Sequence, residues 1–361
     1  MGNYVDRTRK KLIILGIIVI ALIWHNFGPV YKCKNVDKKS EWYVNDIYMS
    51  DQYYYNNLLH TNEQEAYKVM LENIKNIKES FVVDLRPSEV EKVWNALICD
   101  HPELINLSLY RYSSTGKTTK IMPIYITTSK VKLRSMERKV RREIGKVVRK
   151  AKGKSDFEKE KIVYEYLGKN NAYGFTYKNS DQSAYTVFTF SNTVCAGYGK
   201  AAQLLLSNCG VKSMININSN HIWNTVELDG EYYFFDATCS GVFYRNLDGV
   251  YEHVSYMGLN QNQNTSSYEI LYPRLLPDVS GEKYNYYDYM GLTLTYDEND
   301  LSNIKKYIDK SKYRMVEIKF TNYAEAEAGI ARHLSELGLE NVYHYTGYTE
   351  GNQVITMKKK K

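Results

Sequence analysis

Residues 221–236 have the sequence HIWNTVELDGEYYFFD, and this stretch predicts a β-hairpin. The central dipeptide Asp229-Gly230 favours a two-residue turn, because both residue types tolerate positive φ. That turn sets the register of the strands. If the two residues that flank it pair with each other, His221 and Asp236 lie on one face of the sheet as diagonal neighbours. Diagonal partners are roughly 7–8 Å apart at the backbone, a gap that an imidazole and a carboxylate can bridge.

A second informative segment lies upstream, where Cys195 begins the run CAGYGKAAQLLL. Its alanines and leucines predict a helix that ends near Gly210, so Cys195 should lie at the helix N-terminus, with Gly197 and Gly199 keeping that entrance open. Unpaired amides and the helix dipole stabilise a thiolate there and can receive an oxyanion. A buried cysteine alone is usually a small apolar residue, and a histidine on a strand is usually structural. The combination predicts a catalytic triad.

The same residues carry a resemblance to a known family. Residues 194–198, 221–224 and 229–238 resemble the three signature blocks of the bacterial transglutaminase-like superfamily, a branch of the papain-like fold. Residues 100–104 and 121–125 are similar to the lead-in of its membrane-anchored or secreted members, as are residues 183–185. The resemblance implies an α+β fold with a papain-like core, in which a nucleophile helix packs on an antiparallel sheet.

The resemblance also implies roles for individual residues. Cys195 would be the nucleophile, His221 the general base and acid, and Asp236 the carboxylate that orients the imidazole. Tyr185 is a candidate oxyanion-hole donor, and Tyr198 and Trp223 are candidates for lining the substrate groove. No metal or organic cofactor is implied, and no oxygen-rich loop suitable for calcium is evident.

The expected reaction is acyl transfer from a peptide or protein amide through a thioester. An amine acceptor would give an isopeptide cross-link. Water would instead make the protein a cysteine peptidase or amidase acting on proteins or cell-wall peptides. A third alternative is a non-catalytic surface binding module. Three departures from the family pattern, at Gln182, Ala196 and Cys239, bear on the substrate groove and leave the triad complete.

The N-terminus predicts a membrane anchor. A basic tail at residues 1–11 precedes an uncharged segment at residues 12–31, whose ~20 residues at about 1.5 Å each would span a bilayer core. The basic flank should stay in the cytoplasm, so the domain after residue 32 should be extracytoplasmic on a single-pass membrane protein. The alternative is secretion after cleavage of a signal peptide. The four cysteines besides Cys195 could form one or two bridges there, but buried thiols are favoured.

The remaining chain reads as globular, with 43% hydrophobic and 25% charged residues. We expect a spacer at 32–58, an N-terminal α/β region at 59–154, the catalytic core at 155–295 and a C-terminal α/β subdomain at 296–361. The last of these should have the element order α-β-α-β-β, with its second helix closed by Gly338. Capping-box patterns predict helix starts at Thr61, Ser88 and Ser155.

One segment is strongly basic. The segment from Lys130 to Lys154 contains twelve basic residues and only two acidic ones, Glu137 and Glu143. Its local charge is therefore +10, against +7 for the whole chain. Apolar residues recur at helical spacing within it, which predicts an amphipathic helix. Its outer face could simply be solvated, or it could attract anionic cell-envelope polymers or lipid. Nucleic acid is not expected as a partner, because the predicted location is extracytoplasmic and the sequence has no recognisable nucleic-acid-binding motif.

Overall fold

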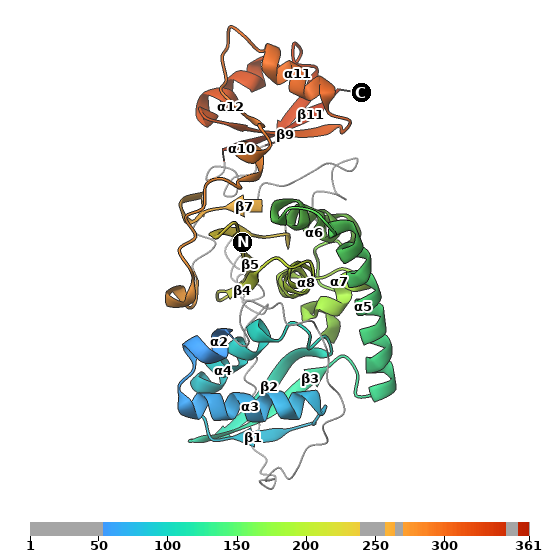
Figure 1. Cartoon of the computed structure of the whole chain (residues 1–361), viewed down its shortest axis with the longest axis vertical. Helices are drawn as coiled ribbons and strands as arrows, with labels where there is room; N and C mark the ends of the chain where they lie inside the picture. The colour runs from blue at the N-terminus through green and yellow to red at the C-terminus, as the bar shows by residue number, and fades with distance from the viewer. Residues whose placement is uncertain (1–52, 239–256, 264–269, 344–352, 361) are drawn as a thin grey trace, which may run out of the picture.

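The computed structural model describes residues 53–238, 257–263, 270–343 and 353–360. Within them the protein is a mixed α+β chain with three small sheets, arranged one after another along its long axis (Figure 1). The predicted tail and anchor at residues 1–31 lie outside the described residues, as does residue Cys239. In the described ranges, no helix combines the length and the apolar character that crossing a membrane requires.

The N-terminal unit packs helices on an antiparallel sheet of order β1-β3-β2. Its elements are α2 (Tyr53–Leu58), α3 (Thr61–Lys75), β1 (Phe81–Val83), α4 (Pro87–Asp100), β2 (Leu107–Thr115) and β3 (Thr118–Tyr125). Helix α2 falls within the predicted spacer but is part of the folded unit. Tyr54 is 3% exposed, and the amides of Tyr54 and Tyr55 each donate to the Asp100 carboxylate at 2.9 Å. The spacer therefore ends before Tyr53.

The predicted capping boxes are placed correctly at one helix of three. Ser155 caps α6 (Asp156–Asn170), accepting from the Glu158 amide at 3.3 Å. In α3 and α4 the N-cap residues are instead His60 and Arg86, whose amides donate to glutamates three positions later at 2.8 Å. The hydrogen bond from the N-cap amide to the glutamate side chain determines where each helix begins. In α4, the proline at the first helical position also has a φ that suits a helix.

The central unit holds the predicted site. Helices α5 (Lys130–Ala151), α6, α7 (Ala184–Phe188) and α8 (Cys195–Asn208) pack beside an antiparallel sheet of order β4-β5-β6-β7. The strands are β4 (Ser213–Ile217), β5 (Ile222–Leu228), β6 (Glu231–Phe235) and β7 (Met257–Leu259). The described part of this unit also contains the 3-10 turns η1 (Asn179–Gln182), η2 (Gln261–Gln263) and η4 (Pro273–Leu275). Helix α8 contacts β4 and β5 and is buried through most of its length.

The C-terminal unit has its own core and a sheet of order β10-β11-β9-β8. It comprises β8 (Thr293–Leu294), α11 (Ser302–Lys310), β9 (Met315–Phe320), α12 (Tyr323–Arg332), β10 (Leu339–Tyr343) and β11 (Val354–Lys359). The predicted α-β-α-β-β order is found, preceded by the short β8, which runs parallel to β9. Helix α12 ends at Arg332, earlier than expected, and Gly338 at φ +69° instead turns the chain into β10.

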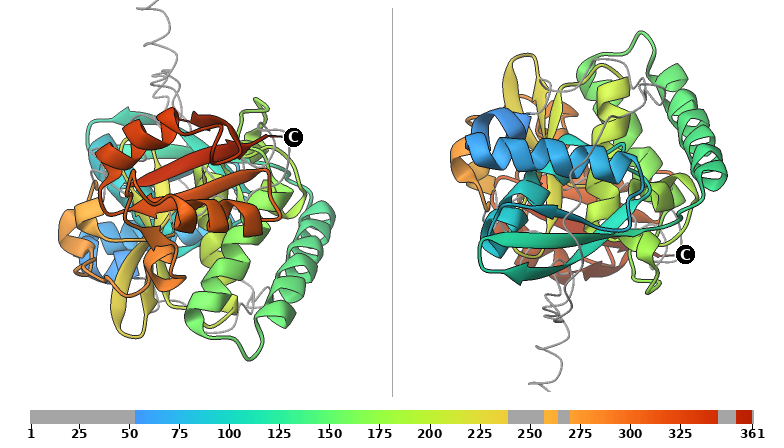
Figure 2. Two further views of the ribbon diagram at one scale, coloured as in Figure 1. Left: turned by 90° about the horizontal axis from the view of Figure 1, so that it is seen from above. Right: turned by 90° about the horizontal axis from the view of Figure 1, so that it is seen from below.

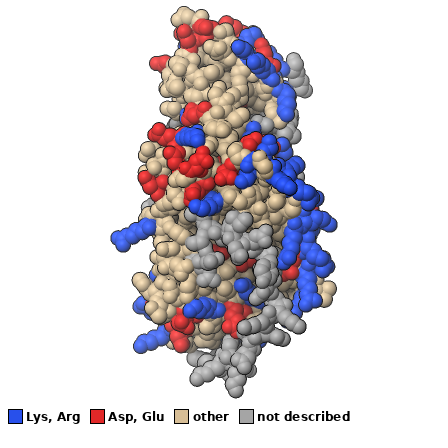
Figure 3. Space-filling model, in the orientation of Figure 1, with Lys and Arg blue, Asp and Glu red and all other residues tan. Residues whose placement is uncertain are grey.

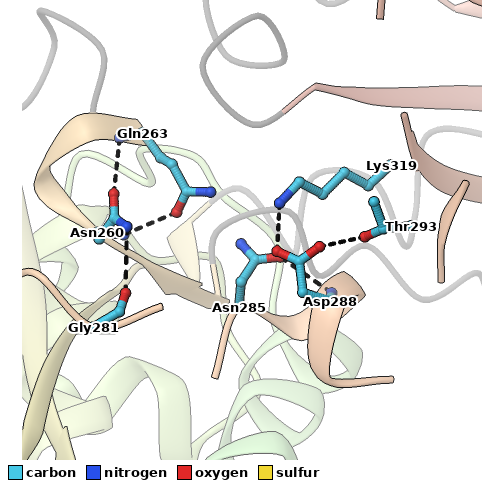
Figure 4. A network of polar contacts seen from close by, with 7 residues as sticks. All are labelled: Asn260, Gln263, Gly281, Asn285, Asp288, Thr293 and Lys319. Atoms are coloured by element: carbon cyan, nitrogen blue, oxygen red, sulfur yellow. Dashed lines mark hydrogen bonds and ion pairs between the residues drawn. The ribbon is translucent and has the colours of Figure 1, made fainter. Parts of the chain in front are cut away.

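A polar network ties this unit to the central one (Figure 4). Asp288, on α10 (Tyr286–Tyr289), pairs with Lys319 of β9 at 2.6 Å and accepts from the Thr293 hydroxyl. Nearby, the Asn260 side chain donates to the Gly281 carbonyl at 3.3 Å. Asp288 therefore connects α10 to β8 and β9, while the Asn260 contact lies within the central unit.

Candidate functional site

The predicted hairpin forms with the predicted register. Leu228 pairs with Glu231, and Asp229 and Gly230 adopt φ of +52° and +86°, the geometry of a two-residue hairpin turn. His221 lies just before β5 and Asp236 just after β6. The imidazole Nε2 and the carboxylate Oδ2 are 2.7 Å apart, so the diagonal contact expected from the turn is present.

His221 is held from two sides. The Asn218 side-chain oxygen accepts from the His221 amide at 2.6 Å, and the Asn218 amide donates to the His221 carbonyl at 3.0 Å. The indole of Trp223 lies parallel to the imidazole, with ring centroids 5.6 Å apart. A tight turn therefore fixes the backbone of the histidine while a buried aromatic ring supports its side chain.

Asp236 is 4% exposed and uses both carboxylate oxygens. Oδ1 accepts from the Thr238 amide at 2.8 Å, while Oδ2 faces His221. Burial alone would raise the pKa of this carboxyl. The charge and hydrogen bond of His221, with the Thr238 amide, outweigh burial and lower the pKa below its usual range. Asp236 is thus an ionised, oriented partner for the imidazole.

Cys195 is the first residue of α8, as expected. The Tyr198 amide donates to the Val194 carbonyl at 3.1 Å, which is the first α-helical bond of α8. The amides of residues 195–197 precede that bond, so they lie where a helix presents donors without intrahelical partners. Cys195 is itself 4% exposed. Its thiol is nearly buried, beside donors that could receive a negatively charged oxygen.

Gly199 brings this helix close to the strand that follows His221. A Cβ at position 199 would lie 2.7 Å from Cγ2 of Ile222, closer than side chains approach. The Asn224 side chain also donates to the Gly199 carbonyl at 3.1 Å. The role of this glycine is therefore close packing of helix on strand, which differs from the open helix entrance expected from the sequence.

The electrostatics join all three predicted residues in one site. Burial lowers the pKa of His221, but the charge and hydrogen bond of Asp236, together with a hydrogen bond and charge interaction from Cys195, raise it to about 10. Since Asp236 occupies Nε2, Nδ1 is the ring nitrogen left for the thiol. The raised pKa favours the protonated imidazole at neutral pH.

Lys200 is a charged residue near the site that the sequence did not single out. It is 7% exposed, and its Nζ donates to the Gln182 carbonyl at 3.1 Å. Burial lowers the pKa of its ammonium to about 8, while charge interactions with Cys99 and Cys195 act in the opposite direction. The only signal in the sequence was a lysine inside an apolar helical run.

Two of the other three candidate residues lie in the core. Tyr198 and Trp223, expected to line a substrate groove, are each 1% exposed, so in this structure they are core residues and not groove walls. Tyr185 lies on α7, which packs against α8, and its ring borders the core cluster that includes Tyr198. Its role as an oxyanion donor stays a prediction. In the described ranges, no group of three His, Cys, Asp or Glu side chains could hold a metal.

No model of a known protein family matches the sequence, and no curated protein matches it either. The resemblance to the transglutaminase-like superfamily therefore depends on the three sequence blocks and the upstream segments named above.

Proposed function

We propose that the protein is a thiol acyltransferase of the transglutaminase-like type, acting on peptide or protein amides. The observation that carries the proposal is the 2.7 Å contact between His221 and Asp236, with Cys195 interacting with the same imidazole. A surface or core histidine needs no buried carboxylate and no thiol partner. Each of these groups has a defined task in acyl transfer.

The fold supports the same proposal. A helix that begins at the nucleophile packs on an antiparallel sheet whose hairpin carries the base and the carboxylate. This is the arrangement expected of a papain-like core, and we assign the central unit to that fold class as part of the proposal. The C-terminal unit would be a supporting subdomain.

The reaction would proceed in two halves. With the proton of Cys195 already held by His221, the sulfur attacks the amide carbonyl carbon, placing the negative charge on the carbonyl oxygen. The first-turn amides of α8 stabilise that oxygen. His221 then returns the proton to the departing amine as the C–N bond breaks, leaving a thioester. In the second half, His221 takes a proton from the acceptor, and the sulfur leaves as the acyl group is transferred.

The acceptor decides between a transferase and a hydrolase. An amine acceptor gives a new amide, whereas water gives a carboxylic acid from the same thioester. We propose an extracytoplasmic site of action on the basis of the uncharged segment at residues 12–31, with secretion as the alternative. Burying the His221–Asp236 pair carries a desolvation penalty, and a purely binding role would not require that pair.

Mass spectrometry of a glutamine-containing peptide would test the proposal. The full chain in a neutral detergent is incubated with the peptide, with and without a primary amine, beside the Cys195→Ala variant. Incorporation of the amine that depends on Cys195 supports a transferase. Cleavage or deamidation that also depends on Cys195 identifies the hydrolase. Equal products from the variant would exclude the triad.

A further inference from the structure

The strongest charged feature outside the candidate site is helix α5. It lies along one flank of the molecule in all three ribbon views (Figures 1 and 2). Its inner face is buried against α6, α7 and α8 by Met136, Val140, Val147 and Ala151. The apolar stripe expected from the sequence is therefore used entirely within the protein.

The outer face is basic along the whole helix. Eleven of the twelve basic residues between positions 130 and 154 are exposed, and Figure 3 shows them as a continuous band of Lys and Arg. The two acidic residues of the segment offset part of this charge. Glu143 is 3% exposed, with Lys146 at 2.8 Å and Arg142 at 3.6 Å, and Glu137 is half-buried. With twelve basic residues against these two, the surface that a partner meets is still predominantly positive.

The arginines and lysines are distributed differently around the helix. At about 100° per residue, five arginines fall within an arc of roughly 100° centred opposite the buried stripe. These are Arg134, Arg138, Arg141, Arg142 and Arg149. Four lysines lie on one flank of that arc: Lys132, Lys139, Lys146 and Lys150. Arginine presents a planar fork that fits phosphate oxygens in pairs, whereas lysine acts as a compact point charge.

We propose that the outer face of α5 binds a linear, phosphate-bearing polymer of the cell envelope. The 22 residues of α5 extend about 33 Å, enough for several consecutive phosphates. The basic residues cover more than half of the circumference, and a flexible chain can follow such a curved surface. This surface is independent of the triad, although α5 contacts α8, so a bound polymer would hold the candidate site beside it.

A bilayer fits this face less well than a polymer does. A flat surface reaches only part of so wide an arc. Peripheral helices also bind membranes by inserting an apolar face, and the apolar face of α5 is buried in the protein core. Val131, at 74% exposed, is the large hydrophobic residue that α5 leaves in solvent. A single exposed valine provides little area for insertion.

The test uses labelled long-chain inorganic polyphosphate and fluorescence anisotropy, with the full chain in a neutral detergent. The helix variant is Arg134→Glu/Arg138→Glu/Arg149→Glu. The matched control, Lys78→Glu/Lys117→Glu/Lys306→Glu, makes the same change in net charge at exposed positions elsewhere. We expect the helix variant to weaken binding at least tenfold and to flatten its salt dependence, and the control to change the Kd by about twofold. Circular dichroism establishes that both variants remain folded.

Three results would overturn the proposal. Equal weakening in the two variants would mean that net charge alone attracts the polymer. Loss of binding to phosphatidylglycerol vesicles in the helix variant, with polyphosphate binding intact, would assign α5 to a bilayer. Tighter binding of a single-stranded oligonucleotide than of polyphosphate of equal charge would point to nucleic acid. A triple Arg→Lys variant with an intermediate loss would support paired guanidinium contacts.

Discussion

His221 and Asp236 are joined by a 2.7 Å contact across the open end of the β5–β6 hairpin, although fifteen positions separate them in sequence. The two side chains differ in exposure: 20% of the histidine side chain is exposed to solvent, against 4% of the aspartate side chain. The imidazole is therefore the accessible member, held from behind by a buried carboxylate. This arrangement lets the histidine move protons at the edge of the core while it keeps a fixed orientation.

Replacing Asp236 by Asn should abolish most activity. The amide keeps the shape of the carboxylate but removes the charge that maintains the imidazolium, so kcat/KM should fall by about 10³–10⁴-fold. Asp229→Asn is the matched control, because Asp229 lies in the same hairpin with 61% of its side chain exposed. Steady-state kinetics of both variants checks the prediction, and comparable rates for wild type and Asp236→Asn would contradict it.

The raised pKa of His221 should make stability depend on pH. The folded-state value of about 10 lies above the unfolded value near 6.5, so the ion pair stabilises the fold fully below pH 6.5. That contribution is lost as the pH rises from 6.5 through 10. Thermal unfolding from pH 6 to 10 should show a steeper fall in Tm for wild type than for His221→Gln. Parallel curves for the two proteins would argue against the pair.

Lys200→Met tests whether the buried ammonium acts on Cys195. The side chain is similar in size, but the substitution removes the donor to the Gln182 carbonyl, so circular dichroism must first establish that the variant is folded. Without the ammonium, alkylation of Cys195 by iodoacetamide at pH 7 should slow about three- to tenfold, and its pH profile should move upward. The control is Lys169→Met at an exposed position of α6. An unchanged profile would leave Lys200 only a structural role.

Two glycine substitutions should have opposite effects on stability. Gly199→Ala places a Cβ 2.7 Å from Ile222, so overpacking of about 1–3 kcal/mol should exceed the gain in helix propensity. Gly145→Ala, in α5, meets Arg149 at an ordinary 3.6 Å and should stabilise by up to about 1 kcal/mol. Urea denaturation measures both changes in unfolding free energy. Stabilisation by Gly199→Ala would mean that α8 is not packed tightly on β5.

The sequence predicted what local rules determine. The Asp229-Gly230 turn set the hairpin register, and the alanine- and leucine-rich run set the start of α8. Burial depended on chain segments that are distant in sequence and was not predictable in this way. Trp223 is covered by Leu259 and Val279, so its position in a motif could not show that it is a core residue.

Lys200 illustrates the same limit from the polar side. Its burial requires the Cys99 region of α4 and the Gln182 carbonyl of η1 to meet α8. No local pattern around position 200 indicates either partner. The capping boxes of α3 and α4 were displaced by one and two positions for a simpler reason, since Gln64 and Glu91 fit the pattern as well as Glu63 and Glu89, which close the helix starts.

The most direct measurement for the central claim is the rate at which Cys195 is alkylated at pH 6, resolved by peptide mapping. It requires no knowledge of the substrate. Cys99 and Cys209 serve as internal references, because burial raises the pKa of both thiols, to about 11 for Cys209. We predict that Cys195 reacts far ahead of them at pH 6 in wild type and loses that advantage in His221→Gln. Equal rates for Cys195 in the two proteins, rising only at alkaline pH, would contradict a thiolate–imidazolium site.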